Sequence, residues 1–322
     1  MQGLVTVFGG SGFVGRYVVR ALAKQGWRIR VAMRRPHLAG ELRVMGDVGQ
    51  VELMQANVRY PDSVAQVMEG ASACVNLVGV LYQAGKQSFE GVHVEAARSL
   101  ALAAKAAGAT RFVQISAIGA DQASQSQYAR TKAAGEAAVS GAFPGATIVR
   151  PSIVFGPEDD FFNRFAGMAV RSPMLPLIGG GTTRFQPVYA GDVGAAVAAC
   201  LADPATAGRT YELGGPGVYS FKQLMELMLH EIQHKRALVP VPTGVAKMLG
   251  GIGDLQTAIL PFLPPQLTKD QVLMLGRDNV ASAHDGLAAL GVTATPLESV
   301  LPQYLWKYRR GGQFAAPEGA HA

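Results

Sequence analysis

The chain has 322 residues, of which 49% are hydrophobic and 16% charged, and it contains 39 glycines and 18 prolines. This composition supports a sizeable core with many turns and excludes an intrinsically disordered chain. The net charge of +6 arises within residues 1–50, where eight Lys and Arg stand against Glu41 and Asp47; this favours one local anionic ligand over a long polyanion such as a nucleic acid. The alternative is a solvated basic face.

Short β-rich segments alternate with Ala-rich helical segments from residue 4 to about residue 155. The expected strands are LVTVFG, RIRVAM, VELMQA, ACVNLVG, RFVQIS and ATIVRP, and the expected helices cover 12–25, 61–68, 92–107 and 129–140. Continuous apolar strands separated by helices are typical of a parallel sheet that is covered on both faces. We therefore predict an α/β fold with a doubly wound parallel Rossmann sheet, formed by a first domain over 1–155.

The alternation loosens after residue 156, where Pro- and Gly-rich connectors separate short helices such as 221–235. This pattern predicts a smaller, partly interleaved C-terminal lobe over 156–310, with segments that return to the sheet. The last residues, 311–322, have the sequence GGQFAAPEGAHA and are expected to form a flexible tail.

A glycine-rich turn follows the first expected strand and opens the first expected helix. Its residues are Gly9, Gly10, Ser11, Gly12, Phe13, Val14 and Gly15. In a GxxGxxG pattern the glycines allow a tight turn and let the backbone approach a pyrophosphate, which rests on the free N–H groups at the helix N-terminus. The strand–turn–helix context predicts a dinucleotide site in the first domain. A purely structural glycine turn is the alternative.

The end of the second expected strand bears on the choice of dinucleotide. NAD-specific sites usually carry an Asp or Glu near this position for the ribose 2′-hydroxyl, whereas this chain has Arg34 and Arg35. A guanidinium binds a 2′-phosphate in a bidentate manner, and a carboxylate repels it. The sequence therefore predicts NADPH (NADP) as the cofactor, with Arg34 the closer of the two; the alternative is an arginine that is simply solvated at the strand end.

Tyr128 and Lys132, in the sequence YARTK, are one helical turn apart on the same face. An ammonium in this position lowers the phenol pKa and holds a nicotinamide ribose, which makes Tyr128 a candidate proton donor beside a hydride. Ser116, twelve residues earlier at the end of RFVQIS, completes the candidate catalytic group. A second YxxxK match, at 82–86, falls in a Gly-containing loop and is the weaker candidate.

These motifs, together with NLVG at 76–79, RPSIVFGPED at 150–159 and QPVYAGDV at 186–193, resemble the extended form of the short-chain dehydrogenase/reductase superfamily. A more specific resemblance is carried by FVQIS, residues 142–166, QPVYAGDV and ATPLE at 294–298. Together they are similar to the nucleotide-binding accessory subunits of respiratory complex I (NADH:ubiquinone oxidoreductase), atypical members of that superfamily. The resemblance extends over nearly the whole chain.

This resemblance implies a tightly bound NADPH with a mainly structural role. It implies a peripheral position on the cytoplasmic side of the bacterial inner membrane, near the quinone-entry region. The implied partners are peripheral-arm subunits of complex I and the membrane surface, with no nucleic acid; outside the complex, the expected location is the cytoplasm. The residues implied to bind the cofactor are Gly9, Ser11, Gly12, Phe13, Val14, Gly15, Arg34, Arg35, Asn57, Val58, Asn76, Leu77, Val78, Ser116, Tyr128, Lys132, Pro151 and Ile153.

Three positions depart from the pattern of active relatives. Ser116 is followed by Ala117 and Ile118 where a second hydroxyl residue is usual. His93 lies in a region where active members often keep an Asn, and Asn57 stands where an Asp often contacts the adenine. Together they indicate a vestigial catalytic group without independent catalysis. The alternative is a free-standing NADP-dependent reductase, epimerase or dehydratase that acts on a nucleotide sugar or another small substrate.

The sequence HEIQH at 230–234 matches a zinc-protease pattern, in which two imidazoles on one helix face hold the metal. Neither Glu nor His follows before His284 to supply a third ligand, so we expect an amphipathic surface helix and no metal site. Cys74 and Cys200 lie in apolar stretches without metal-ligand spacing and are expected to be buried core residues of a reduced compartment.

The most apolar stretch, 237–263, contains prolines and charged residues, so no membrane span is expected. Within it, 247–265 has apolar residues at helical spacing, which fits either the core of the lobe or a segment that contacts lipid or a partner. The chain opens on a strand-like run without a leader pattern, and we expect neither secretion nor organelle import.

Overall fold

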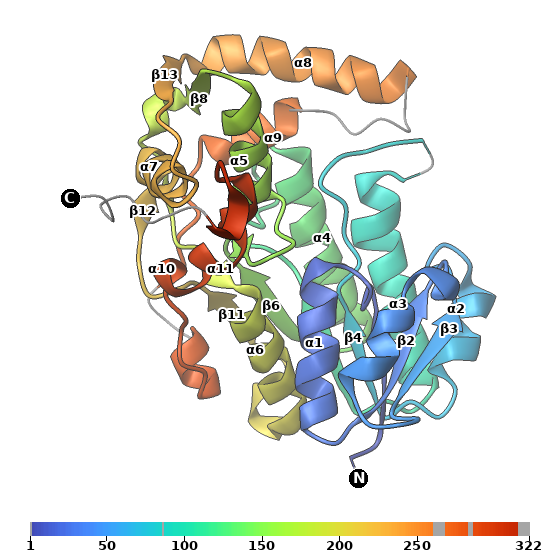
Figure 1. Cartoon of the computed structure of the whole chain (residues 1–322). Coiled ribbons are helices and arrows are strands. Elements are labelled where there is room, and N and C mark those ends of the chain that lie inside the picture. Colours follow the sequence, from blue (N-terminus) through green and yellow to red (C-terminus); the bar gives the residue numbers. More distant parts are fainter. Residues whose placement is uncertain (1, 86, 260–267, 283–285, 315–322) are drawn as a thin grey trace.

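The computed structural model describes residues 2–85, 87–259, 268–282 and 286–314. Its centre is a parallel sheet with the strand order β11-β6-β5-β4-β1-β2-β3 (Figure 1). The strands are β1 (Leu4–Phe8), β2 (Arg28–Met33), β3 (Val51–Gln55), β4 (Ala73–Asn76), β5 (Arg111–Ile115), β6 (Thr147–Pro151) and β11 (Thr210–Leu213). The predicted fold class, a doubly wound parallel sheet, is confirmed.

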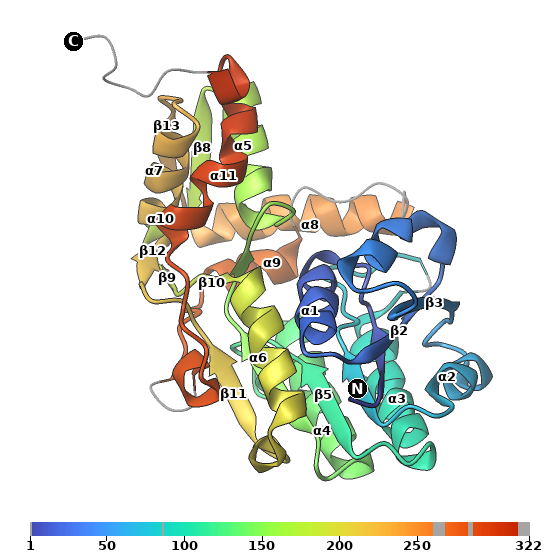
Figure 2. The same cartoon turned by 60° about the horizontal axis from the view of Figure 1, so that its bottom comes forward.

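Helices cover both faces of this sheet (Figure 2). One face is covered by α1 (Phe13–Lys24) and α6 (Ala190–Ala202), and the other by α2 (Pro61–Met68), α3 (Ala96–Ala106) and α4 (Gln127–Ala142). The α1 and α6 backbones approach closely, since a Cβ at Gly194 would lie 2.7 Å from the carbonyl oxygen of Tyr17. Each layer has its own core, in which Leu22 and Phe112, for example, are almost completely buried.

Elements from the second half of the chain, among them β11 and α6, complete the half of the molecule that contains the sheet, which we call the sheet half. β11 pairs with β6 at one edge, and α6 packs beside α1. Val193, Val197 and Leu213 from these elements are fully buried in the same core as β1 and α1. The interleaving that the sequence predicts is therefore observed.

The remaining elements form the smaller lobe, whose core contains Phe162, Phe221, Leu224 and Leu301. Its helices are α5 (Phe161–Arg171), α7 (Phe221–Glu231), α8 (Thr243–Ile259), α9 (Lys269–Leu275), α10 (Leu297–Val300) and α11 (Pro302–Leu305). Its short strands pair as β7 (Val154–Phe155) with β10 (Val188–Tyr189), β8 (Met174–Ile178) with β13 (Ala237–Val241), and β9 (Arg184–Phe185) with β12 (Tyr219–Ser220).

Several element ends differ from the expectations. The helix predicted over 221–235 ends at Glu231, because Gln233 adopts a left-handed conformation with φ of 55°. The helix expected over 92–107 is divided into a π-helix, Glu90–Glu95, and α3. In the predicted tail, Gly312–Phe314 forms a 3₁₀ turn, while 315–322 lies outside the described residues. Over the ranges that the structure describes, no helix has both the length and the apolar character of a membrane span.

Candidate functional site

The glycine-rich turn joins β1 to α1, and its glycines have different roles. Gly9 has a φ of +81°, which favours glycine, and it packs against the backbone of Leu77 and Val78. A Cβ at Gly15 would lie 2.3 Å from the carbonyl oxygen of Gly9, so this position requires glycine for packing. Gly12 differs, because its φ is −75° and, among the described residues, a Cβ there would meet only the Gly9 oxygen, at 3.3 Å.

The N-terminus of α1 is suited to binding an anion. Gly12 is its N-cap and offers no side chain to the first N–H groups of the helix. These groups, from Phe13 onward, remain available to a ligand and carry the positive end of the helix dipole. Ser11 lies in the same turn. The turn therefore fits a pyrophosphate.

The neighbouring strand ends lie at the same edge of the sheet. β2 pairs with β1 in parallel, with Ala32 opposite Phe8, so Arg34 and Arg35 follow directly at that edge, and both are exposed. Beyond β3, Asn57 is half-buried, and its Oδ1 accepts a hydrogen bond from the N–H of Arg59 at 3.2 Å. Val58, next to it, is also half-buried.

Asn76 at the end of β4 holds the next turn. Its Nδ2 donates to Oε1 of Gln114 at 2.9 Å, and its Oδ1 accepts from the N–H of Val78 at 3.0 Å. The Asn76 side chain is almost completely buried, and both its amide nitrogen and its amide oxygen are hydrogen-bonded to other protein atoms. Leu77 and Val78 are thereby held beside Gly9, where they form a wall of the site.

Tyr128 and Lys132 lie on α4, and both are buried. Nζ of Lys132 donates to the carbonyl oxygen of Ile115 at 3.3 Å and lies 5.8 Å from the centre of the Tyr128 ring. Burial lowers the pKa of Lys132 to about 8, although the Glu136 carboxylate opposes this shift. Burial and the nearby Asp270 carboxylate raise the pKa of Tyr128 to about 12. The phenol is thus held in its protonated form at neutral pH.

His93 completes an aromatic cluster around Tyr128. Its ring stacks on Phe89 and meets Tyr128 edge-on, with 5.3 Å between ring centres in both pairs. Nε2 accepts a hydrogen bond from the N–H of Val80 at 3.2 Å, so Nδ1 carries the proton and lies 3.0 Å from Oγ1 of Thr131. Burial and the Lys132 charge lower the pKa of His93 to about 3. His93 is therefore neutral and connects the loop after β4 to α4 through its two ring nitrogens.

Ser116 lies at the carboxyl end of β5, immediately after Ile115. Its Oγ is buried and has no hydrogen-bond partner in the part of the chain that the structure describes. A buried hydroxyl without a partner is unusual, and a bound group that reached it would satisfy it. Pro151 ends β6, and the N–H of Ile153 donates to Oδ1 of Asn279 at 2.9 Å. These positions, with the glycine turn, fit a dinucleotide along the strand ends.

Two residues that hold this edge of the molecule, Asp270 and Asn279, are not predicted from the sequence. Asp270 on α9 accepts hydrogen bonds from the first turn of α4, and Asn279 bonds to Ser152, Ile153 and Ile118. The TKDQ sequence at 268–271 is a recognisable capping box that marks the start of α9. No local signal, however, indicates which distant element Asp270 contacts.

The HEIQH sequence lies at the end of α7, and the second YxxxK match begins in a loop. Tyr82 lies in a loop, and Lys86 is outside the described residues. α7 ends at Glu231, His234 lies beyond it with Nδ1 bonded to the Ile232 oxygen at 2.8 Å, and the Glu231 carboxylate pairs with Arg309 at 3.3 Å. The expected amphipathic helix is therefore shorter than predicted, and the two imidazoles do not share one helix face. Cys74 and Cys200 are buried.

The chain is similar to known proteins over most of its length. The chain is 40% identical over 320 residues to "NADH dehydrogenase [ubiquinone] 1 alpha subcomplex subunit 9, mitochondrial" of Arabidopsis thaliana, covering 97% of this chain and 80% of the relative. It is 31% identical over 258 residues to a ceramide reductase of Caulobacter vibrioides, covering 80% of each.

A dTDP-glucose 4,6-dehydratase from Streptomyces venezuelae, solved with NAD bound, has the same fold, with a TM-score of 0.70 at 18% identity and coverage of 95% of this chain and 96% of that one. The resemblance to complex I accessory subunits is confirmed, and the chain is a homologue of the mitochondrial subunit. The model of the NAD dependent epimerase/dehydratase family matches residues 5–214, and the chain belongs to that family.

Proposed function

We propose that this protein is an NADPH-holding accessory subunit of bacterial respiratory complex I, in which the nucleotide has a mainly structural role. The observation that carries the proposal is the extent of the similarity to the plant mitochondrial subunit, which covers 97% of this chain. The similarity includes the lobe as well as the sheet half. A shared cofactor site alone would not require a similar lobe.

The choice of NADPH rests on the strand end after β2. Arg34 and Arg35 are both exposed at the edge of the sheet that carries the glycine turn, and a guanidinium there favours a 2′-phosphate. The pyrophosphate would rest on the turn at Ser11–Val14, and Asn57 and Val58 would flank the adenine. Tyr128 and Lys132 would hold the nicotinamide ribose, with Ser116, Pro151 and Ile153 nearby. When bound, the nicotinamide supplies a hydride donor.

The structural role of the nucleotide is supported by the surroundings of Tyr128. A proton donor beside a hydride needs a phenol pKa near the working pH, whereas burial and Asp270 raise that of Tyr128 to about 12. Ala117 follows Ser116 and offers no hydroxyl. These groups are suited to hydrogen bonding with a ribose and poorly suited to turnover.

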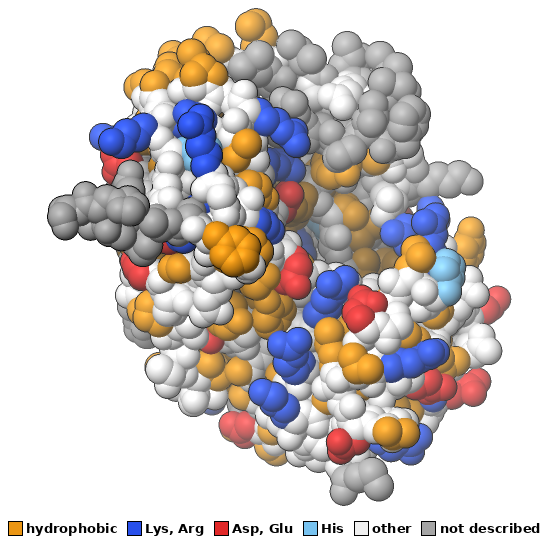
Figure 3. All heavy atoms as spheres, viewed as in Figure 1, with side chains coloured by type: hydrophobic (Ala, Val, Ile, Leu, Met, Phe, Trp, Pro, Cys, Tyr) orange, Lys and Arg blue, Asp and Glu red, His pale blue; other side chains and the backbone are white. Residues whose placement is uncertain are grey.

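The lobe offers a surface for a partner or a membrane. Figure 3 shows hydrophobic side chains along the top of the lobe, over β8, β13 and the start of α8. These three elements carry Met174, Val239, Val245 and Met248, which are 53%, 38%, 45% and 66% exposed. Of the stretch 247–265, the described part has Met248 exposed and Gly250 buried, while 260–265 lies outside the described residues. We propose that this exposed face contacts the complex or the membrane surface.

Native purification tests the proposal. The tagged protein should copurify with membranes and respiratory subunits, and mass spectrometry should find NADPH in the purified material. In a strain without the gene, NADH:quinone activity and assembly of the complex should both fall. Membranes that keep wild-type activity, with the protein recovered only from the soluble fraction, would refute the role in complex I.

A free-standing NADP-dependent reductase is the second candidate. The similarity to a ceramide reductase over 80% of the chain favours a reductase over an epimerase or dehydratase. In that case the protein should oxidise NADPH when a panel of carbonyl, lipid and sugar-nucleotide compounds is added. Tyr128→Phe should abolish this oxidation while the variant still folds and binds NADPH. If neither the wild type nor the variant oxidises NADPH, the accessory role is favoured.

A further inference from the structure

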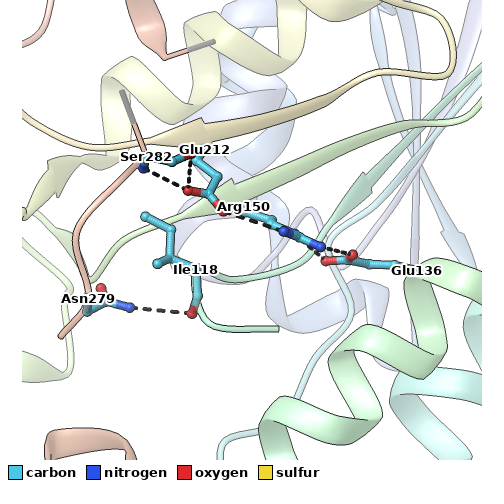
Figure 4. Close-up of polar contacts among 6 residues, drawn as sticks. All are labelled: Ile118, Glu136, Arg150, Glu212, Asn279 and Ser282. Carbon is cyan, nitrogen blue, oxygen red and sulfur yellow. Dashed lines mark hydrogen bonds and ion pairs between the residues drawn. The ribbon is translucent and has the colours of Figure 1, made fainter. Parts of the chain in front are cut away.

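Residues 268–282, which we call the crossing segment, run from α9 across the carboxyl end of the sheet. Oδ2 of Asp121 pairs with Arg277 at 3.2 Å. Asn279 donates to the carbonyl oxygen of Ile118, and Ser282 donates twice to Glu212, at 2.9 Å each (Figure 4). Glu212 in turn shares Arg150 with Glu136 of α4. The lobe is thus joined to the sheet half by several polar contacts along the crossing segment.

Asp270, on the same segment, makes three contacts through one carboxylate. Its carboxylate accepts hydrogen bonds from Oγ of Ser126 at 2.7 Å, from the N–H of Gln127 at 2.7 Å and from the N–H of Tyr128 at 3.1 Å. Ser126, the N-cap of α4, itself accepts from the N–H of Ala129. A carboxylate at a helix N-terminus also interacts favourably with the helix dipole. Asp270 therefore orders the helical turn that carries Tyr128.

The neighbours of Asp270 fix its position. Thr268 and Gln271 form a reciprocal capping box at the start of α9. α8 lies directly against this turn, since a Cβ at Gly250 would come within 2.7 Å of the Lys269 nitrogen. The carboxylate is thus presented by a backbone that is itself held in place by α8.

We propose that Asp270 is a positioning residue for the nicotinamide end of the nucleotide site, and that it makes nucleotide affinity depend on the seating of α8 and α9. The proposal rests on the NADPH site described above. Asp270 does not touch the nucleotide. It orders the first turn of α4, so Tyr128 and Lys132 are in place before a ribose arrives, and less ordering is required on binding.

Two ligands separate this role from a general effect on folding. NADPH reaches the whole site, whereas adenosine 2′,5′-bisphosphate carries the 2′-phosphate and adenine but no nicotinamide ribose. We expect Asp270→Ala to weaken NADPH binding at least fivefold and to change binding of the bisphosphate less than twofold, both measured by calorimetry. Asp270→Asn, which keeps one acceptor oxygen, should recover part of the loss. It also serves as the second variant if Asp270→Ala does not fold.

Asp278→Asn is the matched control, because this acid lies on the same segment but pairs with Arg184 at 2.7 Å. It should bind both ligands as the wild type does. Equal losses of both ligands in the Asp270 variants, or unchanged NADPH binding, would overturn the positioning role and leave the proposed function intact. A wild type that binds no NADPH would instead overturn the proposed function, and this inference with it.

Discussion

Gly12 and Gly15 offer a direct test of the nucleotide site, because the structure assigns them different reasons for being glycine. In Gly12→Val the new Cβ has one protein neighbour, the Gly9 oxygen at 3.3 Å, and the φ of −75° suits a β-branched residue. The nucleotide-free protein should therefore lose no more than about 1 kcal/mol of stability, partly offset by the reduced freedom of its unfolded chain. The new side chain should, however, occupy the space of the pyrophosphate.

The magnitude follows from linkage. A ligand that binds only the folded protein adds RT ln(1 + [L]/Kd) to the free energy of unfolding, about 2.7 kcal/mol at a hundredfold excess over Kd. Gly12→Val should lose this increment almost completely. In Gly15→Ala the Cβ would lie 2.3 Å from the Gly9 oxygen and 2.7 Å from the Gly10 carbonyl carbon. The backbone must then move, and the nucleotide-free protein itself should lose about 1–3 kcal/mol.

Urea unfolding with and without NADPH measures both quantities. Gly141→Ala on α4 is the control, since a Cβ there meets nothing within 4 Å among the described residues; it should raise the stability by no more than about 1 kcal/mol and leave the NADPH increment at its wild-type value. If Gly12→Val keeps the full increment, the pyrophosphate does not lie over this turn. If nucleotide-free Gly15→Ala is as stable as the wild type, the packing argument is wrong. Under the proposed function, less of the Gly12→Val variant than of the wild type should also be retained on complex I.

Three further outcomes are expected. NADPH should bind at least tenfold more tightly than NADH, equivalent to about 1.4 kcal/mol, and Arg34→Glu should remove this preference; calorimetry that gives equal affinities in the wild type would exclude the 2′-phosphate contact. Burial and Lys132 lower the pKa of His93 to about 3, so between about pH 6.5 and pH 3 the unfolded chain binds a proton that the folded chain does not. The free energy of unfolding should therefore fall by up to about 1.4 kcal/mol per pH unit as the pH decreases from 6.5 towards 3. Above pH 6.5 His93 should not affect it. His93→Asn should reduce that slope in acid unfolding, and an unchanged slope would show that His93 is already protonated in the folded protein. Arg150→Met should destabilise the protein by about 1–3 kcal/mol in urea unfolding, because Glu136 and Glu212 lose their shared partner, and a neutral result would show that the two carboxylates are satisfied by solvent.

The sheet half was accessible from the sequence because its signals are local. Most strands of the sheet are short runs rich in apolar residues, helices lie between most of them in the chain, and the glycine turn stands at the first such junction. The positions of Tyr128 and Lys132 on one helix follow from their spacing alone. Gly9 and Gly15 could be identified as a pattern, but only the packing shows that Gly15 is required by the backbone of the same turn.

The remaining features depend on contacts between distant parts of the chain. Asp270 lies 143 positions from Gln127, at the start of the helix that it contacts, and an acidic residue near a predicted helix start has many possible partners. His93 was noted as a departure from a pattern, whereas its neutral state follows from burial and from the Val80 N–H. The early end of α7 follows from Gln233 in a left-handed conformation, which is uncommon for a residue other than glycine.

The surroundings of Tyr128 suit the binding of a ribose better than the release of a proton. Raising the pKa of a phenol from 10 to about 12 makes release of its proton less favourable at neutral pH. Burial is the larger cause and Asp270 the second. The same burial and the same carboxylate order the first turn of α4, which favours a ligand that binds and stays. Holding a ribose requires only a protonated hydroxyl in a fixed place, whereas turnover requires a hydroxyl that exchanges its proton. An arrangement that improves the first at the expense of the second is expected where the bound nucleotide serves the assembly of a larger complex.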